Sequence, residues 1–269
     1  MDGADRIDSA FAAARGDSRA ALMPYMMGGF PDDEMSVAVA AAYVDAGADL
    51  VELGVPFSDP LADGPVIHAA ATRALAGGAT LDSVLEIGAT ISDRVPVVAM
   101  AYANMVLASG PGEFGARAAD AGLAGVIVPD LPPEEAIEAR EAFNHRGLAL
   151  IPLVAPTTPV ERRRRICADA QGFVYVVSDT RTTGERDRLP TELAELVEAT
   201  KADASVPVAV GFGIGTADQA AEVGRVADGV IVGSRLVRAV SEAGDRSDAA
   251  IAVADFIAGA RAAMAAAPA

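Results

Sequence analysis

The chain of 269 residues contains one cysteine, two histidines and no tryptophan. Cys167 has no second cysteine to pair with, so a disulfide within the chain is excluded, as is usual in a reducing compartment. His68 and His145 do not stand in the spacing of a zinc site, so we expect no metal ion. The sequence therefore describes a protein without internal cross-links or a bound metal.

Basic residues are scarce relative to acidic ones, with 21 Lys and Arg against 38 Asp and Glu, and the net charge is −17. Such a field repels nucleic acid and anionic membrane surfaces, so we expect neither as a partner. The amino terminus, MDGADRIDSAF, lacks the basic and apolar regions of a secretory signal. No apolar run approaches the roughly twenty residues of a membrane span. These absences predict a soluble, cytoplasmic protein.

Hydrophobic residues make up 52% of the chain, enough for one large core. The length suits a single α/β barrel, which typically has about 250 residues. Eight short apolar runs are nearly continuous rather than alternating, which is typical of buried parallel strands. They cover residues 22–28, 49–54, 95–102, 125–129, 148–154, 172–177, 206–211 and 229–233.

Helical segments separate these runs, with Asp32 and Asp33 able to cap one helix and residues 132–135 beginning another. Eight strands alternating with helices predict a parallel sheet with right-handed crossovers, and eight is the number that closes. We therefore predict a single (β/α)8 TIM barrel over residues 1–269. Residues 1–20 are expected to form an extra helix that plugs the barrel bottom through Ile7, Ala10, Phe11 and Ala14, and residues 262–269 to fray.

The most informative segment is residues 51–65, VELGVPFSDPLADGP. A strand ends near Glu52 and runs into a loop whose three prolines fix φ and remove donors. Glu52 and Asp63 are thereby held in place, as general acid–base chemistry requires. Taken singly, each acid has an equally good structural interpretation: Glu52 as a salt-bridged strand end, and Asp63 as the cap of a turn before Gly64.

Other polar residues and glycines fall at the carboxyl ends of the predicted strands, where barrels have their active sites. Tyr102 and Asn104 follow the third strand, and Tyr175 lies on the sixth. The seventh strand ends in residues 211–215, GFGIG, and the eighth in residues 233–234, GS. Glycines can simply turn tight corners, but two such corners at these two strands favour a phosphate site. Residues 178–189 form an ordinary solvated loop or a lid.

The signature, together with the strings APTTP at 155–159, GFVY at 172–175 and GFGI at 211–214, resembles the tryptophan synthase alpha chain family over roughly residues 11–260. The resemblance implies cleavage of indole-3-glycerol phosphate to indole and glyceraldehyde 3-phosphate, without metal or cofactor. It also implies a beta chain as partner in an α2β2 assembly, with pyridoxal phosphate only in that beta chain.

The resemblance assigns roles to residues. Glu52 would protonate indole C3 and take the proton of the glycerol hydroxyl, and Asp63 would accept from the indole N–H. Substrate contacts would come from Tyr25, Met100, Tyr102, Ile127, Leu153, Tyr175, Thr183 and Phe212. Phosphate would be bound by Gly184, Gly213, Gly233 and Ser234. The beta chain would meet Pro56, Asp59, Asn104 and Pro132.

The chain departs from the family pattern in the loop, where Arg181 replaces an expected glycine, and at residues 26–29, MMGG. Three alternatives therefore stand beside a synthase subunit. In these alternatives the chain would be a stand-alone lyase that releases indole, a weakly catalytic activator of the beta chain, or another phosphate-binding barrel such as a sugar-phosphate isomerase.

Overall fold

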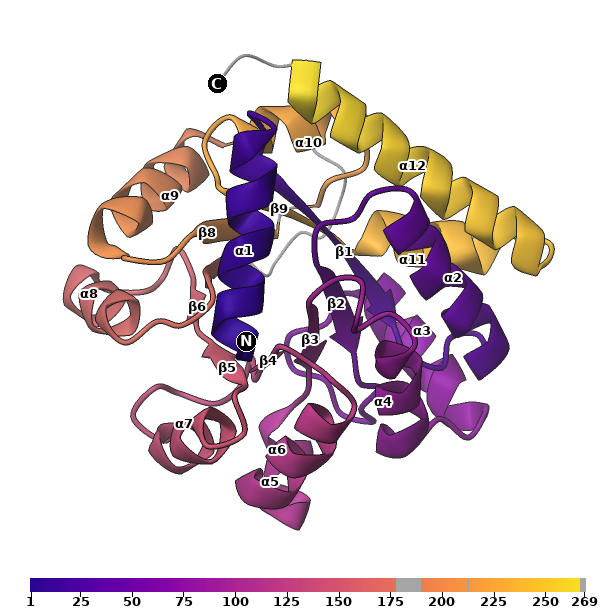
Figure 1. Cartoon of the computed structure of the whole chain (residues 1–269), viewed down its shortest axis with the longest axis horizontal. Helices are drawn as coiled ribbons and strands as arrows, with labels where there is room; N and C mark the ends of the chain where they lie inside the picture. Colours follow the sequence, from indigo (N-terminus) through magenta and orange to yellow (C-terminus); the bar gives the residue numbers. More distant parts are fainter. Residues whose placement is uncertain (178–189, 212, 267–269) are drawn as a thin grey trace.

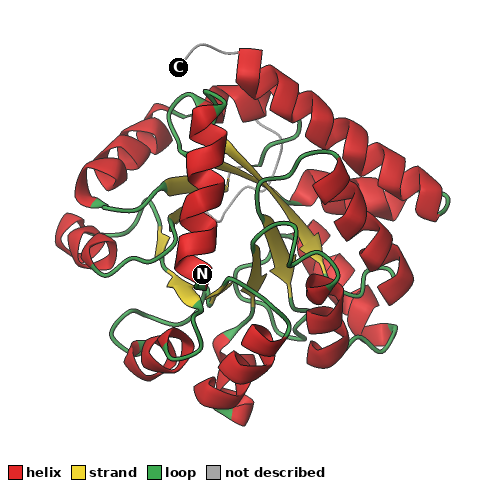
Figure 2. Ribbon diagram, in the orientation of Figure 1, coloured by secondary structure: helices red, strands yellow, loops and turns green. Residues whose placement is uncertain are grey.

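The computed structural model of the chain describes residues 1–177, 190–211 and 213–266. All of the described strands belong to one parallel sheet in the order β5-β4-β3-β2-β1-β9-β8-β7-β6, and helices surround the sheet (Figures 1 and 2). The strands are β1 Ala21–Met27, β2 Val51–Gly54, β3 Val97–Met100, β4 Gly125–Ile127, β5 Ala149–Ile151, β6 Leu153–Val154, β7 Val174–Val177, β8 Val208–Gly211 and β9 Gly229–Val232. The predicted TIM barrel is confirmed.

The fifth predicted strand, residues 148–154, is broken into β5 and β6 by Pro152. Proline has no N–H to donate to a neighbouring strand, so the ladder is interrupted there. β5 pairs with β4 and β6 pairs with β7, so the two ends of the sheet are consecutive in the chain. The covalent chain through Pro152 therefore joins the ends of the sheet into a barrel.

The helices begin where the sequence provides caps. The Asp32 side chain accepts a hydrogen bond from Met35 N at 2.8 Å, which confirms the predicted cap, whereas residues 133–135 form a turn and the helix starts only at Ile137. The helices around the barrel are α2 Asp33–Asp45, α3 Pro65–Ala76, α4 Leu81–Ala89, α5 Ala103–Ser109, α6 Pro111–Asp120, α7 Ile137–Asn144, α8 Val160–Ala168, α9 Thr191–Asp203, α10 Ala217–Gly224, α11 Ser234–Glu242 and α12 Arg246–Ala266.

The predicted extra helix is α1, Gly3–Gly16. Figure 1 shows it lying across the middle of the ring of strands. Ile7, Phe11 and Ala14 are buried in one cluster with the inward side chains of the strands, and the rings of Phe11 and Phe173 are 5.8 Å apart. The helix therefore fills the barrel at the amino-terminal ends of its strands, as predicted.

The carboxyl-terminal helix α12 is long and apolar enough, by length and composition alone, to cross a membrane. In the structure it packs against α10 and α2 through one face, which buries Val253, Ile257 and Met264. A helix with one buried face is the ordinary outer helix of a barrel. It continues to Ala266, so the predicted fraying from residue 262 is not observed in the described part of the tail.

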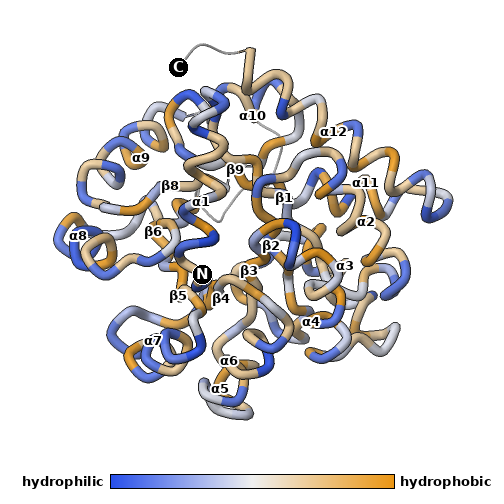
Figure 3. Tube along the Cα trace, viewed as in Figure 1, coloured by the Kyte–Doolittle hydropathy of each residue, from blue (hydrophilic) through white to orange (hydrophobic). Residues whose placement is uncertain are grey.

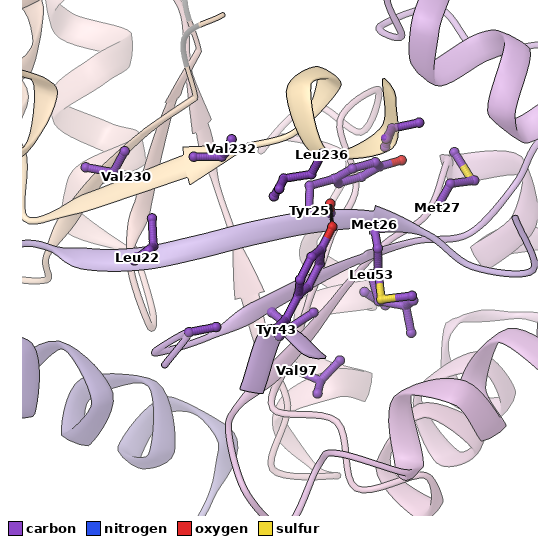
Figure 4. Close-up of a cluster of buried hydrophobic side chains, with 14 of the residues drawn as sticks. Leu22, Tyr25, Met26, Met27, Tyr43, Leu53, Val97, Val230, Val232 and Leu236 are labelled. Carbon is purple, nitrogen blue, oxygen red and sulfur yellow. Dashed lines mark hydrogen bonds between the residues drawn. The ribbon is translucent and has the colours of Figure 1, made fainter. Parts of the chain in front are cut away.

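Between the strands and the helices lies a second apolar layer, formed by the outward side chains of the sheet. Figure 4 shows part of it, and in Figure 3 hydrophobic segments follow the strands while the outer helices alternate with hydrophilic residues. Its one polar contact in this view is the hydroxyl of Tyr43, which donates to the carbonyl oxygen of Tyr25 at 3.1 Å. The Tyr43 contact fixes the main chain of β1 at the residue whose side chain enters the barrel.

At the amino-terminal ends of the strands, a buried ion pair joins a residue before β1 to a residue before β2. The Arg19 side chain is 2% exposed and donates to both oxygens of Asp49, at 2.5 and 2.8 Å. Asp49 also accepts from Leu22 N at 2.7 Å, which ties β1 to β2. Because this pair lies at the opposite end of the barrel from the predicted site, its contribution is to stability.

Asp49→Ala should therefore lower the free energy of unfolding by about 3 kcal/mol, since it leaves the Arg19 cation buried without its main partner. The measurement is urea unfolding at pH 7. Asp45→Ala is the matched control, because the side chains of Asp45 and its partner Arg94 are 68% and 46% exposed, respectively. We expect this variant to lose less than about 1 kcal/mol of unfolding free energy. Equal losses in the two variants would contradict the assignment.

Candidate active site

A cavity of about 470 Å³ opens at the carboxyl ends of the strands. Adjacent strands contribute to its wall in register, with Tyr25 on β1 opposite Glu52 on β2, and Leu153 on β6 opposite Tyr175 on β7. These positions face inward because side chains along a strand alternate between its two faces. The predicted site residues that line this one cavity are Tyr25, Glu52, Asp63, Met100, Leu153, Tyr175, Gly213, Gly233 and Ser234.

Glu52 is 1% exposed, and neither of its carboxylate oxygens has a hydrogen-bond partner among the described residues. The salt bridge that would make it a structural strand end is therefore not formed with any described residue. Burial, together with the nearby charge of Asp63, raises the pKa of Glu52 to about 8. At neutral pH the Glu52 carboxyl is protonated in most molecules, and it can donate this proton into the cavity.

Asp63 is half-buried in the loop opposite, and Tyr102 holds it in position. The Tyr102 hydroxyl donates to Asp63 Oδ1 at 2.9 Å and accepts from Ala62 N at 3.1 Å, while its ring stacks on Phe57 at 5.3 Å. Burial raises the pKa of Asp63, although the Tyr102 hydrogen bond and the charge of His68 act in the opposite direction. Gly64 is the N-cap residue of α3, and the hydrogen bond that the Asp63 side chain makes among the described residues is with Tyr102 rather than with the main chain of the turn.

Tyr102→Phe should lower kcat/KM for the reaction at this site roughly tenfold, since a hydrogen bond to a charged group is worth about 1.5–3 kcal/mol. The same change should raise the pKa of Asp63, because the bond that favours its carboxylate is lost. Steady-state kinetics and carboxyl NMR titration measure the two effects. An unchanged Asp63 titration would show that Tyr102 does not hold the carboxylate.

Two tyrosines, Tyr25 and Tyr175, line the cavity, and glycines make room for them. A Cβ added at Gly54 would collide with the Tyr25 hydroxyl, and one at Gly211 would collide with that of Tyr175. Ile127, which was predicted to touch substrate, is fully buried in the layer below and does not line the cavity. Two aromatic side chains therefore contribute to the wall of the cavity.

The glycine corners of the two last strands lie at one end of the same cavity. Gly213 and Gly215 follow β8, and Gly233 is the N-cap residue of α11, whose first residue is Ser234. A helix amino terminus presents free N–H groups and a favourable dipole to an anion. Arg235 and Arg238 also line this end, and the sequence analysis missed both of them. The signal was available: two basic residues three apart at the start of the helix that follows the Gly-Ser corner.

Three predicted residues, Thr183, Gly184 and Phe212, lie outside the described residues, as does the loop with Arg181, so their roles stay predictions. Among the residues predicted to meet a partner, Asp59 and Asn104 are exposed and Pro132 is half-buried. Pro56 is buried, so it shapes the loop from below rather than offering a surface. Within the described parts of the chain, no three His, Cys, Asp or Glu side chains gather as metal ligands.

A (β/α)8 barrel whose cavity is lined by a buried, proton-holding glutamate and a second carboxylate belongs to the class of barrels suited to acid–base chemistry. A family model described as tryptophan synthase alpha chain matches residues 11–266, and the chain belongs to this family. As a member, it is a lyase of tryptophan biosynthesis, and its substrate is indole-3-glycerol phosphate.

Similar proteins agree in sequence and in structure. The chain is 48% identical to a tryptophan synthase alpha chain of Synechococcus, covering 87% of this chain and 88% of the relative. It is 47% identical to one of Carboxydothermus hydrogenoformans, with 87% and 89% covered. The structure of Mycobacterium tuberculosis tryptophan synthase superposes with a TM-score of 0.90 at 38% identity, over 96% of this chain and 98% of that one. The alpha subunit of Legionella pneumophila gives 0.88 at 36% identity, over 98% of both.

Proposed function

We propose that Glu52 and Asp63 carry out the cleavage of indole-3-glycerol phosphate, with Glu52 as the acid and base. The observation that supports this most is the environment of Glu52: a buried carboxyl facing the cavity with no partner and a pKa of about 8. A buried ionisable group without a partner costs free energy. Such groups concentrate at functional sites, where that cost sets a pKa close to the working pH.

In the first step the protonated Glu52 donates its proton to C3 of the indole ring, whose nitrogen becomes cationic. The Asp63 carboxylate accepts a hydrogen bond from the indole N–H and stabilises this cation. Tyr102 keeps the carboxylate in place through its own hydrogen bond to Asp63. The Glu52 carboxylate then takes the proton of the hydroxyl on the carbon attached to C3. The carbon–carbon bond breaks, its electron pair returns to the ring, and indole and glyceraldehyde 3-phosphate leave with Glu52 protonated again.

The cavity accommodates the two halves of the substrate at different places. Tyr25, Met100, Leu153 and Tyr175 form an apolar enclosure that suits the flat indole ring and excludes water. Gly213, Gly233 and Ser234 lie where backbone N–H groups can hold the phosphate. The resemblance adds substrate contact for Phe212, a bond to Asp63 for Thr183 and a phosphate contact for Gly184, all three of which lie outside the described residues.

The chain needs no metal or cofactor of its own in this chemistry, because proton transfers alone break the bond. We place it in the cytoplasm, as one component of an α2β2 assembly with a beta chain that binds pyridoxal phosphate. Exposed Asp59 and Asn104, with half-buried Pro132, belong to the face that meets this partner. The net charge of −17 is unfavourable for nucleic acid and membrane surfaces, and neither is proposed as a partner.

The test is indole release from indole-3-glycerol phosphate by the purified chain, alone and with one equivalent of beta chain. Slow release that rises sharply with the beta chain is the result expected of a synthase subunit. Fast release without it would identify a stand-alone lyase. If no indole is released in either condition, the remaining interpretation is that the chain acts as an activator of the beta chain.

A further inference from the structure

Arg235 brings a full positive charge to the phosphate end of the cavity. It is the second residue of α11, directly after the Gly233-Ser234 corner, and its side chain lines the same cavity as Gly213 and Ser234. Arg238, three residues further on the same helix, lines the cavity as well. Residues three apart lie on one face of a helix, so both arginines face the end where the phosphate is expected.

The Arg235 guanidinium is oriented by an aromatic ring. It lies over the ring of Phe256, on α12, with 5.5 Å between the guanidinium carbon and the ring centroid. Stacking of this kind occupies the flat face of the guanidinium and leaves the N–H donors at its edge available. Within the described parts of the chain, no carboxylate lies within salt-bridge distance of Arg235, although many of the other arginines are ion-paired. Its charge is therefore available to an anion in the cavity.

The charge of the whole chain makes this arginine important. At −17, the protein repels a phosphate dianion on approach, and a local cation offsets that repulsion where the anion binds. We propose that Arg235 binds the phosphate group of the substrate through the edge of its guanidinium, in addition to the backbone donors at the glycine corners. This inference rests on the proposed function, because it takes the phosphate of indole-3-glycerol phosphate as its ligand.

Arg235→Gln should raise KM for indole-3-glycerol phosphate about tenfold and change kcat less than about twofold, since the phosphate is bound equally in the ground and transition states. The KM of the wild type should also rise more steeply with added KCl than that of the variant. Arg225→Gln is the matched control: it removes the same charge from the exposed C-cap of α10, at the opposite end of the barrel. Its KM should equal that of the wild type.

Binding of inorganic phosphate, followed by calorimetry, tests the same contact without turnover. Arg235→Gln should weaken it about tenfold, and Arg235→Lys, which keeps the charge without the stacked plane, should weaken it less. Phosphate binding and KM that are the same in wild type and Arg235→Gln would overturn the proposal. A wild type that binds phosphate through Arg235 but releases no indole, with or without the beta chain, would contradict the proposed function and leave the Arg235 contact standing.

Discussion

Glu52→Gln should lower kcat for indole-3-glycerol phosphate cleavage by roughly 10²–10⁴-fold, the usual contribution of a general acid–base group. Glutamine has nearly the same shape, so substrate should still fit and KM should change little. What is lost is the proton that glutamate gives to indole C3 and takes back from the hydroxyl. Single-turnover kinetics separate this chemical step from binding. A variant with kcat within tenfold of the wild type would exclude Glu52 as the acid and base.

The same substitution should stabilise the fold, and the gain should depend on pH. The pKa of Glu52 is about 8 in the folded chain, against an ordinary value of 4.5. Between these values the folded state binds more protons than the unfolded state, so wild-type stability falls as pH rises from about 4.5 to 8 and then levels off. Glutamine does not titrate. Glu52→Gln should therefore gain at most about 5 kcal/mol above pH 8, at about 1.36 kcal/mol per unit, and little below pH 4.5.

Asp63→Asn should lower kcat by roughly 10²–10³-fold, comparable to the loss of one charge-stabilising group in other enzymes. An amide carries no charge with which to stabilise the cationic ring, although it can still accept a hydrogen bond from the indole N–H. Steady-state and single-turnover rates measure the loss. The exposed acid Asp59, in the same loop, provides the control: Asp59→Asn should leave cleavage by the isolated chain unchanged.

A second readout of Asp63→Asn distinguishes charge from shape. The negative charge of Asp63 is one of the two causes that raise the pKa of Glu52, after burial. Removing it should lower the pKa of Glu52 and move the corresponding limb of the pH–rate profile to lower pH. An unmoved limb would show that the two carboxyl groups do not interact, and their joint role would then fail.

Much of the fold was predictable because buried parallel strands leave a strong mark in sequence. The apolar runs gave the order and position of the strands, and the spacing of Ile7, Phe11 and Ala14 gave the plug. The break at Pro152 was predictable as well, since proline cannot donate within a sheet. The separation of α3 from α4 was predictable too, since Gly77 and Gly78 stand where the first helix ends, and glycine commonly ends helices.

Site residues were predictable where the residue type itself indicates chemistry. They were less predictable where the role depends on whether the side chain is buried or lines the cavity. Alternation along a strand shows that Ile127 points inward, but not that it is packed in the buried inner cluster instead of lining the cavity, as its partner in register Met100 does. Pro56 was assigned to the partner face through the resemblance alone, and its burial could not be predicted from that match. Arg235 escaped notice because the charge was considered over the whole chain, which hides a single cation at one helix end.

The plug formed by α1 affects how substrate enters the enzyme and how products leave it. Because Ile7 and Phe11 fill one end of the barrel, the cavity lined by the described residues opens through a mouth at the other end. If indole binds beside Tyr25 and Tyr175 as proposed, it leaves through this mouth unless the partner opens a second exit. A molecule that blocks the mouth would then halt entry and departure together, and the order in which products leave would report on whether the partner is bound.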